Sequence, residues 1–564
     1  MSSVSPATGT EKTAAQAGLK PSLLILKDGY SFNQFRGDLF GGITAAVIAL
    51  PLALAFGVAS GAGAISGLYG AIAVGFFATI FGGTPAQISG PTGPMTVVMA
   101  VIVATHANNL PEAFAIVIAG GALQIMFGAM RIGKYITYTP YSVVSGFMTG
   151  IGVIIIIVQL LPFVGAPVAT GGVIGALQAL SALRLQDVQV GAAGIALAAI
   201  GMQIIWPKRL QRIFPAPLAA LIAGTIVAAL FFRNIPVIGA VPSGLPHIQL
   251  PMLALTAAPK ILQAAFILAL LGSIDSLLTS LIADSVTRKR HDPDMELIGQ
   301  GIGNMAAGLI GGLPGAGATM RTLVNVRAGG RTPVSGAIHA LVLLSIALGL
   351  GSLVAQVPQA VLAAILLKVG WDIIDWRYLK RMQSAPREKF IVMLITFALT
   401  VFVDLITAVG VGIILASFVN AKGLAEHQLK GVGVAGADGA GFLDEEERAI
   451  LRAAGGRIIV TSLSGSFSYA SARDLARRAS PELTGVDIVV YDFSNVGFID
   501  TSAALAIEEC VGLAYENGQK VFVSGLSGPV ARALDGLGAL DRVAPADRFA
   551  SRRQAINAAA ARLA

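Results

Sequence analysis

An acidic residue stands in the middle of an apolar segment that is long enough to cross a membrane. Asp275 is the only charged residue of the run LQAAFILALLGSIDSLLTSLIAD, residues 262–284, before Asp284 at its far end. A charged side chain in mid-membrane costs at least about 2.5–3.5 kcal/mol on insertion scales, so it persists where it has a partner or a cavity. Thr279 lies four residues on, which places its hydroxyl on the same helix face. This pair is therefore a candidate ion site.

The chemistry of the pair depends on what lies beside it. A carboxylate, a hydroxyl and exposed carbonyls of the Gly315–Ala318 stretch would form an oxygen cage for a hard monovalent cation. The same carboxylate could instead carry a proton, or it could form a structural salt bridge with Arg321. The residues alone leave these alternatives open.

Arg321 is a cation in the first turn of a short apolar helix, where it opposes the helix dipole. Its position therefore needs another reason, and attracting an anion into a cavity is one. Pairing with a carboxylate, without contact to any substrate, is the alternative.

Two segments interrupt the apolar pattern in the same way. One reads GGTPAQISGPTGPMT, residues 82–96, and the other GGLPGAGATMRT, residues 311–322. Each has a Gly-Gly-x-Pro turn, an extended stretch of small residues, and a threonine, Thr92 or Thr319, at the expected N-cap of a half-helix. A helix that begins inside the membrane presents free N–H groups and a positive dipole end, which attract anions.

Such matched interruptions in two halves of a chain are typical of the midplane binding site of a transporter. The extended backbone must line a cavity or pack within protein, because lipid cannot satisfy its polar groups. Two glycine-rich kinks that serve only helix packing are the alternative. Phe56, in ALPLALAFGVASG, is a candidate pocket wall or a packing residue.

Apolar runs of spanning length must position these residues. We expect fourteen membrane segments: 39–58, 64–81, 92–106, 112–130, 141–165, 188–206, 216–232, 262–284, 296–311, 319–328, 335–352, 357–370, 389–405 and 407–422. The loops after even-numbered segments carry most of the lysines and arginines, which predicts that these loops and both termini are cytoplasmic. The two interrupted segments are the third and the tenth, so the halves of the chain would have opposite topology.

Composition supports this organisation. The chain of 564 residues is 55% hydrophobic and 12% charged, against roughly 25% charged in soluble proteins. The net charge of +8 fits basic cytoplasmic loops and not nucleic-acid binding. Cys510 is the single cysteine, which excludes an internal disulfide, and the five histidines lack ligand spacing. No nucleotide motif or catalytic triad is present, so we expect neither an enzyme nor ATP-driven transport.

The two ends of the chain differ from its middle. Residues 1–38 lack the apolar core of a signal peptide and predict a cytoplasmic N-terminal segment. The transport domain is expected over 39–425, a glycine-rich linker over 426–442, and a soluble domain over 443–564. There, RIIVTSLSG and DIVVYDFS predict buried strands, and ALDGLGALDRV and SRRQAINAAAARLA predict helices, as in a small α/β domain.

The chain resembles the SulP (sulfate permease, or solute carrier 26) family over nearly its whole length. The resemblance is carried by DLFGGITAAVIALPLALAFGVASGAGA, SGPTGPMT, GSIDSLLTSLIADSVT, GQGIGNMAAGLIGGLPGAGATMRT and DFSNVGFIDTSAAL, the last similar to the core of a STAS domain. It implies a polytopic α-helical, UraA-like fold with a seven-plus-seven inverted repeat, core and gate subdomains, and a cytoplasmic STAS domain. It also implies a homodimer, formed partly through that domain, in a bacterial inner membrane.

Within the family, the chain is most similar to cyanobacterial-type sodium-dependent bicarbonate transporters. This resemblance implies that Asp275, Thr279, Gly317 and Thr319 hold sodium as the coupling ion. It implies that Thr92, Ala318 and Thr319 help to hold the anion. We add Gly93, Arg321 and Phe56 to the candidate anion site because of their positions in the sequence.

Three positions depart from the expected pattern. Gly90 stands where the bicarbonate type would have an acidic residue, and Arg321 stands where it would have glycine. In having Arg321, the chain is more similar to the sulfate, chloride and dicarboxylate carriers of the family. Thr501 falls at the phosphoacceptor position of soluble STAS proteins, but Ala503 replaces the usual glycine there.

The leading hypothesis is a secondary active transporter of small inorganic anions that couples bicarbonate uptake to sodium through elevator-like alternating access. A proton-coupled sulfate or C4-dicarboxylate transporter, with Asp275 as proton carrier, is an alternative, and an uncoupled anion channel is another. A nucleobase or organic-ion carrier of the same fold is disfavoured by Arg321 and by the lack of a second intramembrane acid near Asp275.

Overall fold

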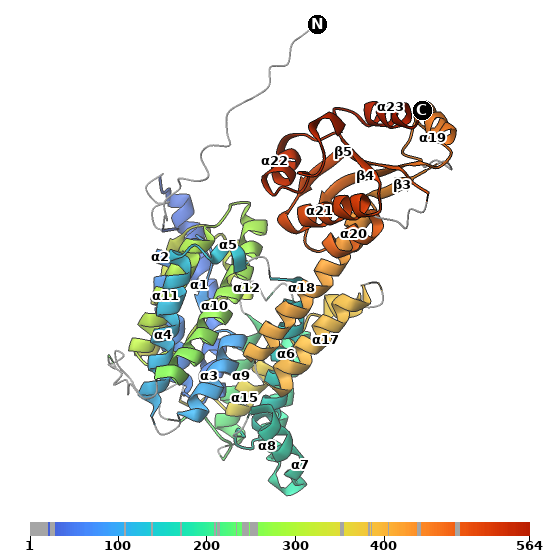
Figure 1. Ribbon diagram of the computed structural model, residues 1–564. Helices are drawn as coiled ribbons and strands as arrows, with labels where there is room; N and C mark the ends of the chain where they lie inside the picture. Colours follow the sequence, from blue (N-terminus) through green and yellow to red (C-terminus); the bar gives the residue numbers. More distant parts are fainter. Residues whose placement is uncertain are drawn as a thin grey trace. The chain divides into compact units, whose positions relative to one another are not determined.

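Apolar runs fold into helices over most of residues 1–413, the first of two units into which the chain divides; residues 414–564 form the second (Figure 1). The structure is a computed structural model. It describes residues 21–22, 29–106, 109–136, 139–169, 172–207, 210, 215–232, 234–239, 248, 258–349, 355–381, 384, 386–403, 405–436, 441–479 and 485–564.

A helix overlaps each of the fourteen segments expected from the sequence. These are α1 Phe32–Ala59, α2 Ala64–Phe81, α3 Gly93–Thr105, α4 Leu110–Ala129, α6 Tyr141–Phe163, α8 Val190–Ile205, α9 Ala216–Phe231, α10 Ala258–Thr287, α11 Pro293–Leu309, α12 Thr319–Ala328, α13 Pro333–Gly349, α15 Gln359–Ile373, α17 Arg387–Phe402 and α18 Leu405–Leu429. Three shorter helices, α5 Gly133–Ile136, α7 Gly172–Ala182 and α16 Trp376–Lys380, lie between them.

Among the described residues, six helices are individually long and apolar enough to cross a membrane: α1, α2, α4, α6, α10 and α18. Helices α12 and α13 together make a further candidate span, bent by 110°. The chain therefore has the helices of a multi-pass membrane protein, with several shorter helices packed among the long ones.

Glycines allow the helices of the first unit to touch backbone to backbone. A Cβ built on Gly301 of α11 would lie 2.4 Å from the carbonyl oxygen of Gly121 in α4, and one built on Gly121 would lie 2.5 Å from the Gly301 oxygen. Apolar helices in lipid associate chiefly through close packing, which small residues permit. This contact fixes α4 against α11, the helix that precedes the second interrupted segment.

Two very short strands lie where the sequence interrupts its apolar pattern. Strand β1, Ser89–Gly90, pairs antiparallel with β2, Ala316–Gly317, so that Ser89 faces Gly317 and Gly90 faces Ala316. We call this pair the ribbon. The ribbon joins segments that are more than two hundred residues apart in the sequence. Its hydrogen bonds satisfy backbone N–H and C=O groups for which lipid offers no partner.

The second unit is a five-stranded sheet with helices on both faces. Its strands are β3 Val432–Ala435, β4 Ile458–Phe467, β5 Ile488–Ile499, β6 Lys520–Ser524 and β7 Arg548–Phe549, in the order β3-β4-β5-β6-β7. Strand β3 is antiparallel to β4, and the other pairs are parallel. The predicted strands are present, and β3 lies inside the stretch that the sequence assigns to a linker.

Successive residues of β5 enter different cores because side chains alternate across a strand. Val489 and Tyr491 join the core beneath α20 Ala472–Ala479, α21 Thr501–Glu516 and α22 Gly528–Gly536. Ile488 and Val490 join the core beneath α19 Glu445–Ala453 and α23 Arg552–Leu563. Both faces of the sheet are thus buried, as its parallel strands require.

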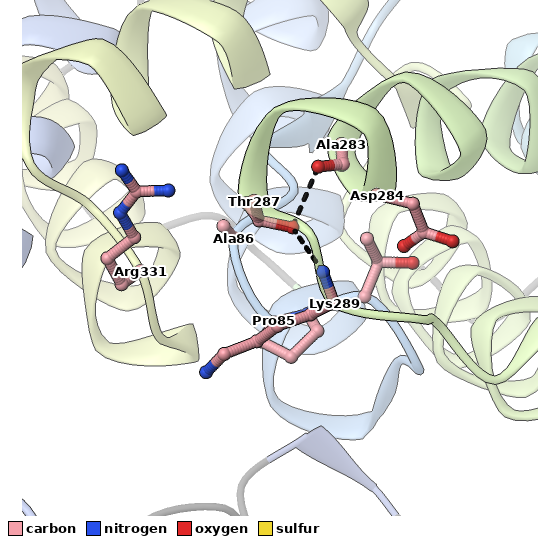
Figure 2. A pocket seen from close by; sticks show the side chains of 8 residues that line it. Pro85, Ala86, Ala283, Asp284, Thr287, Lys289 and Arg331 are labelled. Atoms are coloured by element: carbon pink, nitrogen blue, oxygen red, sulfur yellow. Dashed lines mark hydrogen bonds between the residues drawn. The ribbon is translucent and has the colours of Figure 1, made fainter.

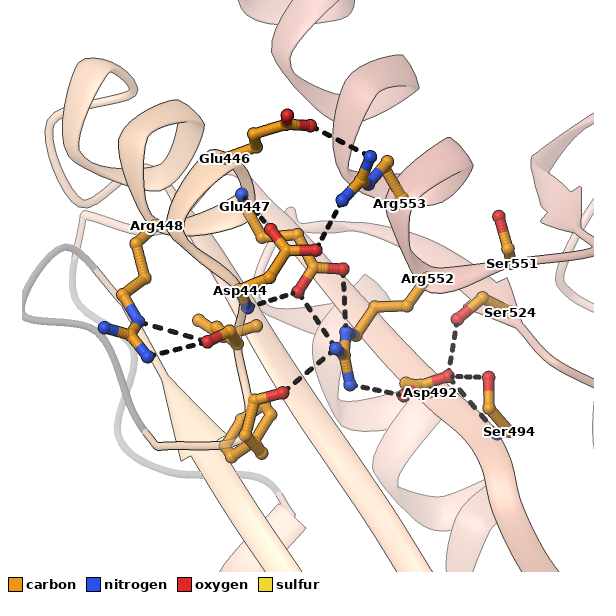
Figure 3. A network of polar contacts seen from close by, with 12 residues as sticks. Asp444, Glu446, Glu447, Arg448, Asp492, Ser494, Ser524, Ser551, Arg552 and Arg553 are labelled. Atoms are coloured by element: carbon orange, nitrogen blue, oxygen red, sulfur yellow. Dashed lines mark hydrogen bonds and ion pairs between the residues drawn. The ribbon is translucent and has the colours of Figure 1, made fainter.

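Arg552 attaches the last helix to this sheet (Figure 3). Its guanidinium lies 2.9 Å from Glu447 of α19, 3.3 Å from Asp492 of β5 and 3.0 Å from the carbonyl oxygen of Phe442. Glu447 and Asp492 are 3% and 0% exposed, so each carboxylate depends on this partner. Burial alone would lower the pKa of Arg552, but the hydrogen bonds and charges of these carboxylates raise it.

Candidate functional site

The N-termini of two half-helices flank the ribbon from its opposite ends. Helix α3 begins three residues after β1, and α12 begins two residues after β2. Because β1 and β2 are antiparallel, the two helices leave the ribbon in opposite directions. Both positive dipole ends therefore act on one short stretch of backbone, which favours an anion there.

Side chains of α12 hold the backbone that leads into α3. Asn325 donates to the carbonyl oxygen of Ala86 at 2.9 Å, and the Thr322 hydroxyl accepts from the backbone N–H of Ile88 at 3.0 Å. Arg321 donates to the carbonyl oxygen of Pro91 at 2.6 Å. The second interrupted segment thus fixes the first.

Side chains of α10 and α11 hold the other strand. Asn304 accepts from the backbone N–H of Gly315 at 2.7 Å and donates to the carbonyl oxygen of the same residue at 3.0 Å. The Ser276 hydroxyl accepts from the N–H of Gly317 at 3.0 Å. These bonds replace the water that an extended backbone would otherwise need.

Three of the four residues expected to hold a cation are in direct contact. The Thr279 hydroxyl donates to the carbonyl oxygen of Gly317 at 3.0 Å and lies 2.9 Å from the Thr319 hydroxyl. Asp275 lies one turn earlier on α10, and its buried Oδ2 has no hydrogen-bond partner. The structure therefore brings two hydroxyls and a carbonyl together, with the Asp275 carboxylate one helical turn before Thr279 on the same helix.

This set of donors fits a monovalent hard cation. All four groups offer oxygen, a single carboxylate supplies one negative charge, and its buried Oδ2 lacks a proton donor. Hydroxyl and carbonyl oxygens beside a helix break are typical sodium ligands in transporters. No Asp275–Arg321 ion pair forms in the described part of the chain, although the Arg321 charge acts on Asp275.

The residues expected to hold an anion gather at the two helix starts. Thr92 is the N-cap of α3, yet its hydroxyl makes no capping bond. Its buried Oγ1 lies beside the Asp275 carboxylate without a hydrogen bond of normal geometry. Gly93 follows, and a Cβ there would lie 2.9 Å from Ile373 of α15 and 3.0 Å from Ile155 of α6. The start of α3 thus fits closely against these two helices.

The N-cap of the second half-helix differs from the expectation. Ala318, not Thr319, is the N-cap of α12, and Thr319 is the first helical residue. The N–H of Ala318 donates to the carbonyl oxygen of Ile88 at 2.9 Å, which extends the ribbon by one residue. The hydroxyl of Thr319 is thereby directed to Thr279 and is not used as a cap.

Arg321 fills the space that a side chain at position 90 would take. Its side chain is 2% exposed, and a Cβ on Gly90 would lie 2.8 Å from its Nη1. Gly90 also has a φ of +150°, which side chains rarely adopt. The two departures from the bicarbonate-type pattern are therefore one structural feature, which places a fixed positive charge beside the ribbon.

The remaining predicted residues lie elsewhere. Phe56 is 3% exposed in the main hydrophobic core of the first unit, in the same buried cluster as Met95 and Met99 of α3. Thr501 is exposed in the first turn of α21 in the second unit. The preceding Asp500 is the N-cap and accepts from the N–H of Ala503 at 2.9 Å.

Glu296 is another buried carboxylate of the first unit. We did not single it out from the sequence, because it stands at the start of the expected segment 296–311. It is 1% exposed and accepts from the N–H of Gly83 at 3.0 Å, from Gln87 at 2.7 Å and from Gln300 at 2.8 Å. None of these bonds joins Glu296 to Asp275, so the lack of a second acid near Asp275 stays a prediction. The signal was present in the four-residue spacing of Glu296, Gln300 and Asn304, which marks one polar helix face.

Comparisons with known proteins identify the family of the chain. The sulfate permease family model matches residues 35–396, and the STAS domain model matches residues 452–555. The chain is 43% identical over 537 residues to the bicarbonate transporter BicA of Picosynechococcus sp., covering 93% of this chain and 94% of that protein. It is 34% identical over 403 residues to the putative sulfate transporter YvdB of Bacillus subtilis, covering 69% and 74% of the two chains.

Solved structures show the same fold. The transmembrane domain of a cyanobacterial BicA matches with a TM-score of 0.63 at 50% identity, covering 68% of this chain and 99% of that one. The structure of SLC26A9 matches with a TM-score of 0.81 at 17% identity, covering 96% and 93% of the two chains. The chain therefore belongs to the sulfate permease family, as a multi-pass membrane transporter of anions that carries a STAS domain.

Proposed function

We propose that this protein takes up bicarbonate together with sodium. The observation that carries the proposal is the convergence of Thr279, Gly317 and Thr319 beside Asp275, at the ribbon between the two half-helices. A cation held there would add a positive charge next to the anion site. Similarity to the bicarbonate transporter BicA over nearly the whole chain supports the choice of anion.

The chemistry assigns a role to each group. Asp275, the hydroxyls of Thr279 and Thr319 and the Gly317 carbonyl would hold sodium. The hydroxyl of Thr92, the N–H groups at the starts of α3 and α12, and the Arg321 guanidinium would hold the anion. Each ligand would lower the cost of binding the other, because their charges are opposite and the surroundings are apolar.

A proton-coupled sulfate transporter is the second candidate, and Arg321 is the observation that favours it. A guanidinium fixed in the site suits an oxyanion of higher charge, and the similar protein YvdB is described as a putative sulfate transporter. In this case Asp275 would exchange a proton instead of binding sodium.

Uptake into proteoliposomes separates the candidates. We expect labelled bicarbonate to accumulate only when an inward sodium gradient is imposed, with saturable kinetics. Bicarbonate uptake that ignores sodium would contradict sodium coupling, and sulfate uptake driven by a proton gradient would establish the second candidate. An ohmic current without saturation would indicate an anion channel instead.

We also propose the membrane arrangement that this mechanism needs. The fourteen helices would form a seven-plus-seven inverted repeat with core and gate subdomains, moving by elevator-like alternating access. Both termini would lie in the cytoplasm of a bacterial cell, and the protein would be a homodimer held partly by its STAS domain. Chemical cross-linking in native membranes and protease accessibility of the C-terminal domain would test these assignments.

A further inference from the structure

Glu296 of α11 is the centre of a buried hydrogen-bond network that the proposed function does not use. Its carboxylate accepts from the side-chain amides of Gln87 and Gln300, at 2.7 and 2.8 Å, and from the backbone N–H of Gly83 at 3.0 Å. All three side chains are buried. Burying a carboxylate is costly, and apolar residues of similar volume often pack as well. The network therefore calls for a role other than packing.

Gln87 links Glu296 to the helix that carries the proposed cation ligands. An ionised carboxylate only accepts hydrogen bonds, so Nε2 of Gln87 faces Glu296 and its Oε1 faces the other way. That Oε1 accepts from the Ser280 hydroxyl of α10 at 3.0 Å. Ser280 directly follows Thr279, whose hydroxyl contacts the carbonyl oxygen of Gly317. Glu296 thus sets the direction of an amide that bonds beside Thr279.

The same amide lies directly against Gly317. A Cβ built on Gly317 would collide with Gln87, only 2.7 Å from its Cδ, so glycine alone leaves room for the amide there. The Gly317 peptide groups are fixed by α10, because its N–H donates to Ser276 and its carbonyl oxygen accepts from Thr279. Gln87 therefore limits how far this strand can move away from Thr279.

The chain before Gln87 also lies along α10. The Thr84 hydroxyl is 2.8 Å from that of Ser280. Figure 2 shows Pro85 and Ala86 beside Thr287 of α10, where all three line one small hollow. The first interrupted segment is therefore held by α10 as well as by α11.

We propose that Glu296 is a positioning residue for the cation site. By fixing the direction of the Gln87 amide, it keeps the Gly317 carbonyl and the Thr279 hydroxyl turned toward a bound sodium ion. This inference rests on the proposed function for the identity of the cation. Glu296 would act through Gln87, so its loss should weaken sodium binding without changing anion binding at saturating sodium.

Sodium binding to the purified full-length protein tests this role. The rise in melting temperature with sodium chloride, against choline chloride at equal concentration, gives a half-saturating sodium concentration without any transport. Glu296→Gln should raise this concentration about five- to tenfold, the effect on a binding constant of losing one hydrogen bond. The half-saturating bicarbonate concentration at saturating sodium should stay the same. A role in stability alone would lower the melting temperature and leave both half-saturating concentrations unchanged.

An exchange of the two side chains provides a rescue. In Glu296→Gln with Gln87→Glu, the amide at position 296 can donate to the carboxylate at position 87, which can still accept from Ser280. We expect this double variant to return the half-saturating sodium concentration to within about twofold of the parent value.

Two methionine variants complete the experiment. Gln87→Met keeps the length of the side chain and removes its amide, so it should weaken sodium binding as Glu296→Gln does. It also measures the effect if Glu296→Gln does not fold. Gln203→Met is the matched control, because Gln203 is a buried glutamine of α8 whose amide donates to the carbonyl oxygen of Ala199 in its own helix.

Three results would overturn the inference and leave the proposed function intact. These are unchanged sodium half-saturation in Glu296→Gln and Gln87→Met, an equal rise in Gln203→Met, and no recovery in the double variant. If the parent protein shows no stabilisation by sodium, sodium coupling itself fails, and Glu296 has no cation site to position.

Discussion

Asp275 is the residue on which cation coupling depends. Asp275→Asn keeps the shape of the side chain but removes its charge, while the contacts among Thr279, Gly317 and Thr319 stay available. We expect this variant to fold and to lose stimulation of uptake by sodium. Initial rates at graded sodium concentrations measure this, and Ser273→Ala, which removes only a bond to the Ala269 carbonyl within α10, is the control. Undiminished sodium stimulation in the variant would refute the role.

Gly90 and Arg321 form a pair in which one residue is small because the other is large. In Gly90→Ala the new Cβ would lie 2.8 Å from Arg321 Nη1, at a backbone φ that disfavours side chains. The new Cβ would push the guanidinium away from the proposed anion site, and a loss of about 1.4 kcal/mol in binding free energy would raise the half-saturating anion concentration about tenfold. Gly201→Ala is the control, because nothing lies within 4 Å of its Cβ position. Unchanged half-saturation in Gly90→Ala would show that Arg321 can move at no cost.

At the scale of elements, the sequence predicted the helices well and the contacts between them poorly. Long apolar runs locate α1, α2 and α10, and the two Gly-Gly-x-Pro motifs locate the starts of α3 and α12. The bonds from Asn325 to Ala86 and from Thr322 to Ile88 join residues more than two hundred positions apart. No local pattern encodes such partners, so the ribbon emerged only from the structure.

The short elements of the second unit were missed for a different reason. Helices α19 and α20 have few residues and mixed polarity, and β3 contains only two β-branched residues among four. Local propensity over such lengths is weak, and tertiary packing decides the outcome. The longer β4 and β5 were predicted because each begins with a run of largely buried β-branched residues.

Helix α23 depends on Arg552 for its attachment. Arg552→Met would leave Glu447 and Asp492 buried without a cation, which costs about 3–5 kcal/mol. Hydrogen exchange in the full-length protein should then show faster exchange in β5 and α23. Arg553→Met is the control, because its partners Asp444 and Glu446 are exposed, and exposed ion pairs contribute little to stability. Equal protection in both variants would contradict the role of Arg552.

The cap of α19 should give the second unit a response to acid. A hydrogen bond from the N–H of Glu447, followed by the bond from Arg553, lowers the pKa of Asp444. Because the folded pKa is below the unfolded value of about 4, ionised Asp444 stabilises the fold above that pH, and this contribution is lost as the pH falls through the folded pKa. Asp444→Asn should therefore be less stable than the parent at pH 6 but not at pH 2. A difference that persists unchanged at pH 2 would argue against an ionic origin.

At the scale of the whole molecule, the ribbon and the predicted ion ligands all lie in the first unit. The described hydrogen bonds of the ribbon are made by residues of that unit. We expect a chain truncated after Leu429, the end of α18, to keep its affinity for the anion, while the stability of the proposed dimer can change. Equilibrium anion binding to the truncated protein measures this. A clear loss of affinity would mean that the second unit shapes the anion site.

The close fit of Arg321 over Gly90 has a consequence for how such a site can change through successive mutations. Starting from this chain, a larger residue at position 90 meets the guanidinium unless Arg321 has first been shortened. A chain that gains an arginine at position 321 follows the reverse order, because position 90 must already be glycine when the arginine appears. One charge arrangement has an acidic residue at position 90 and glycine at position 321, and the other has Gly90 and Arg321. Any series of single mutations between them therefore passes through an intermediate with no long side chain at position 90 or 321. That intermediate would depend on the helix N-termini and the bound cation to hold its anion.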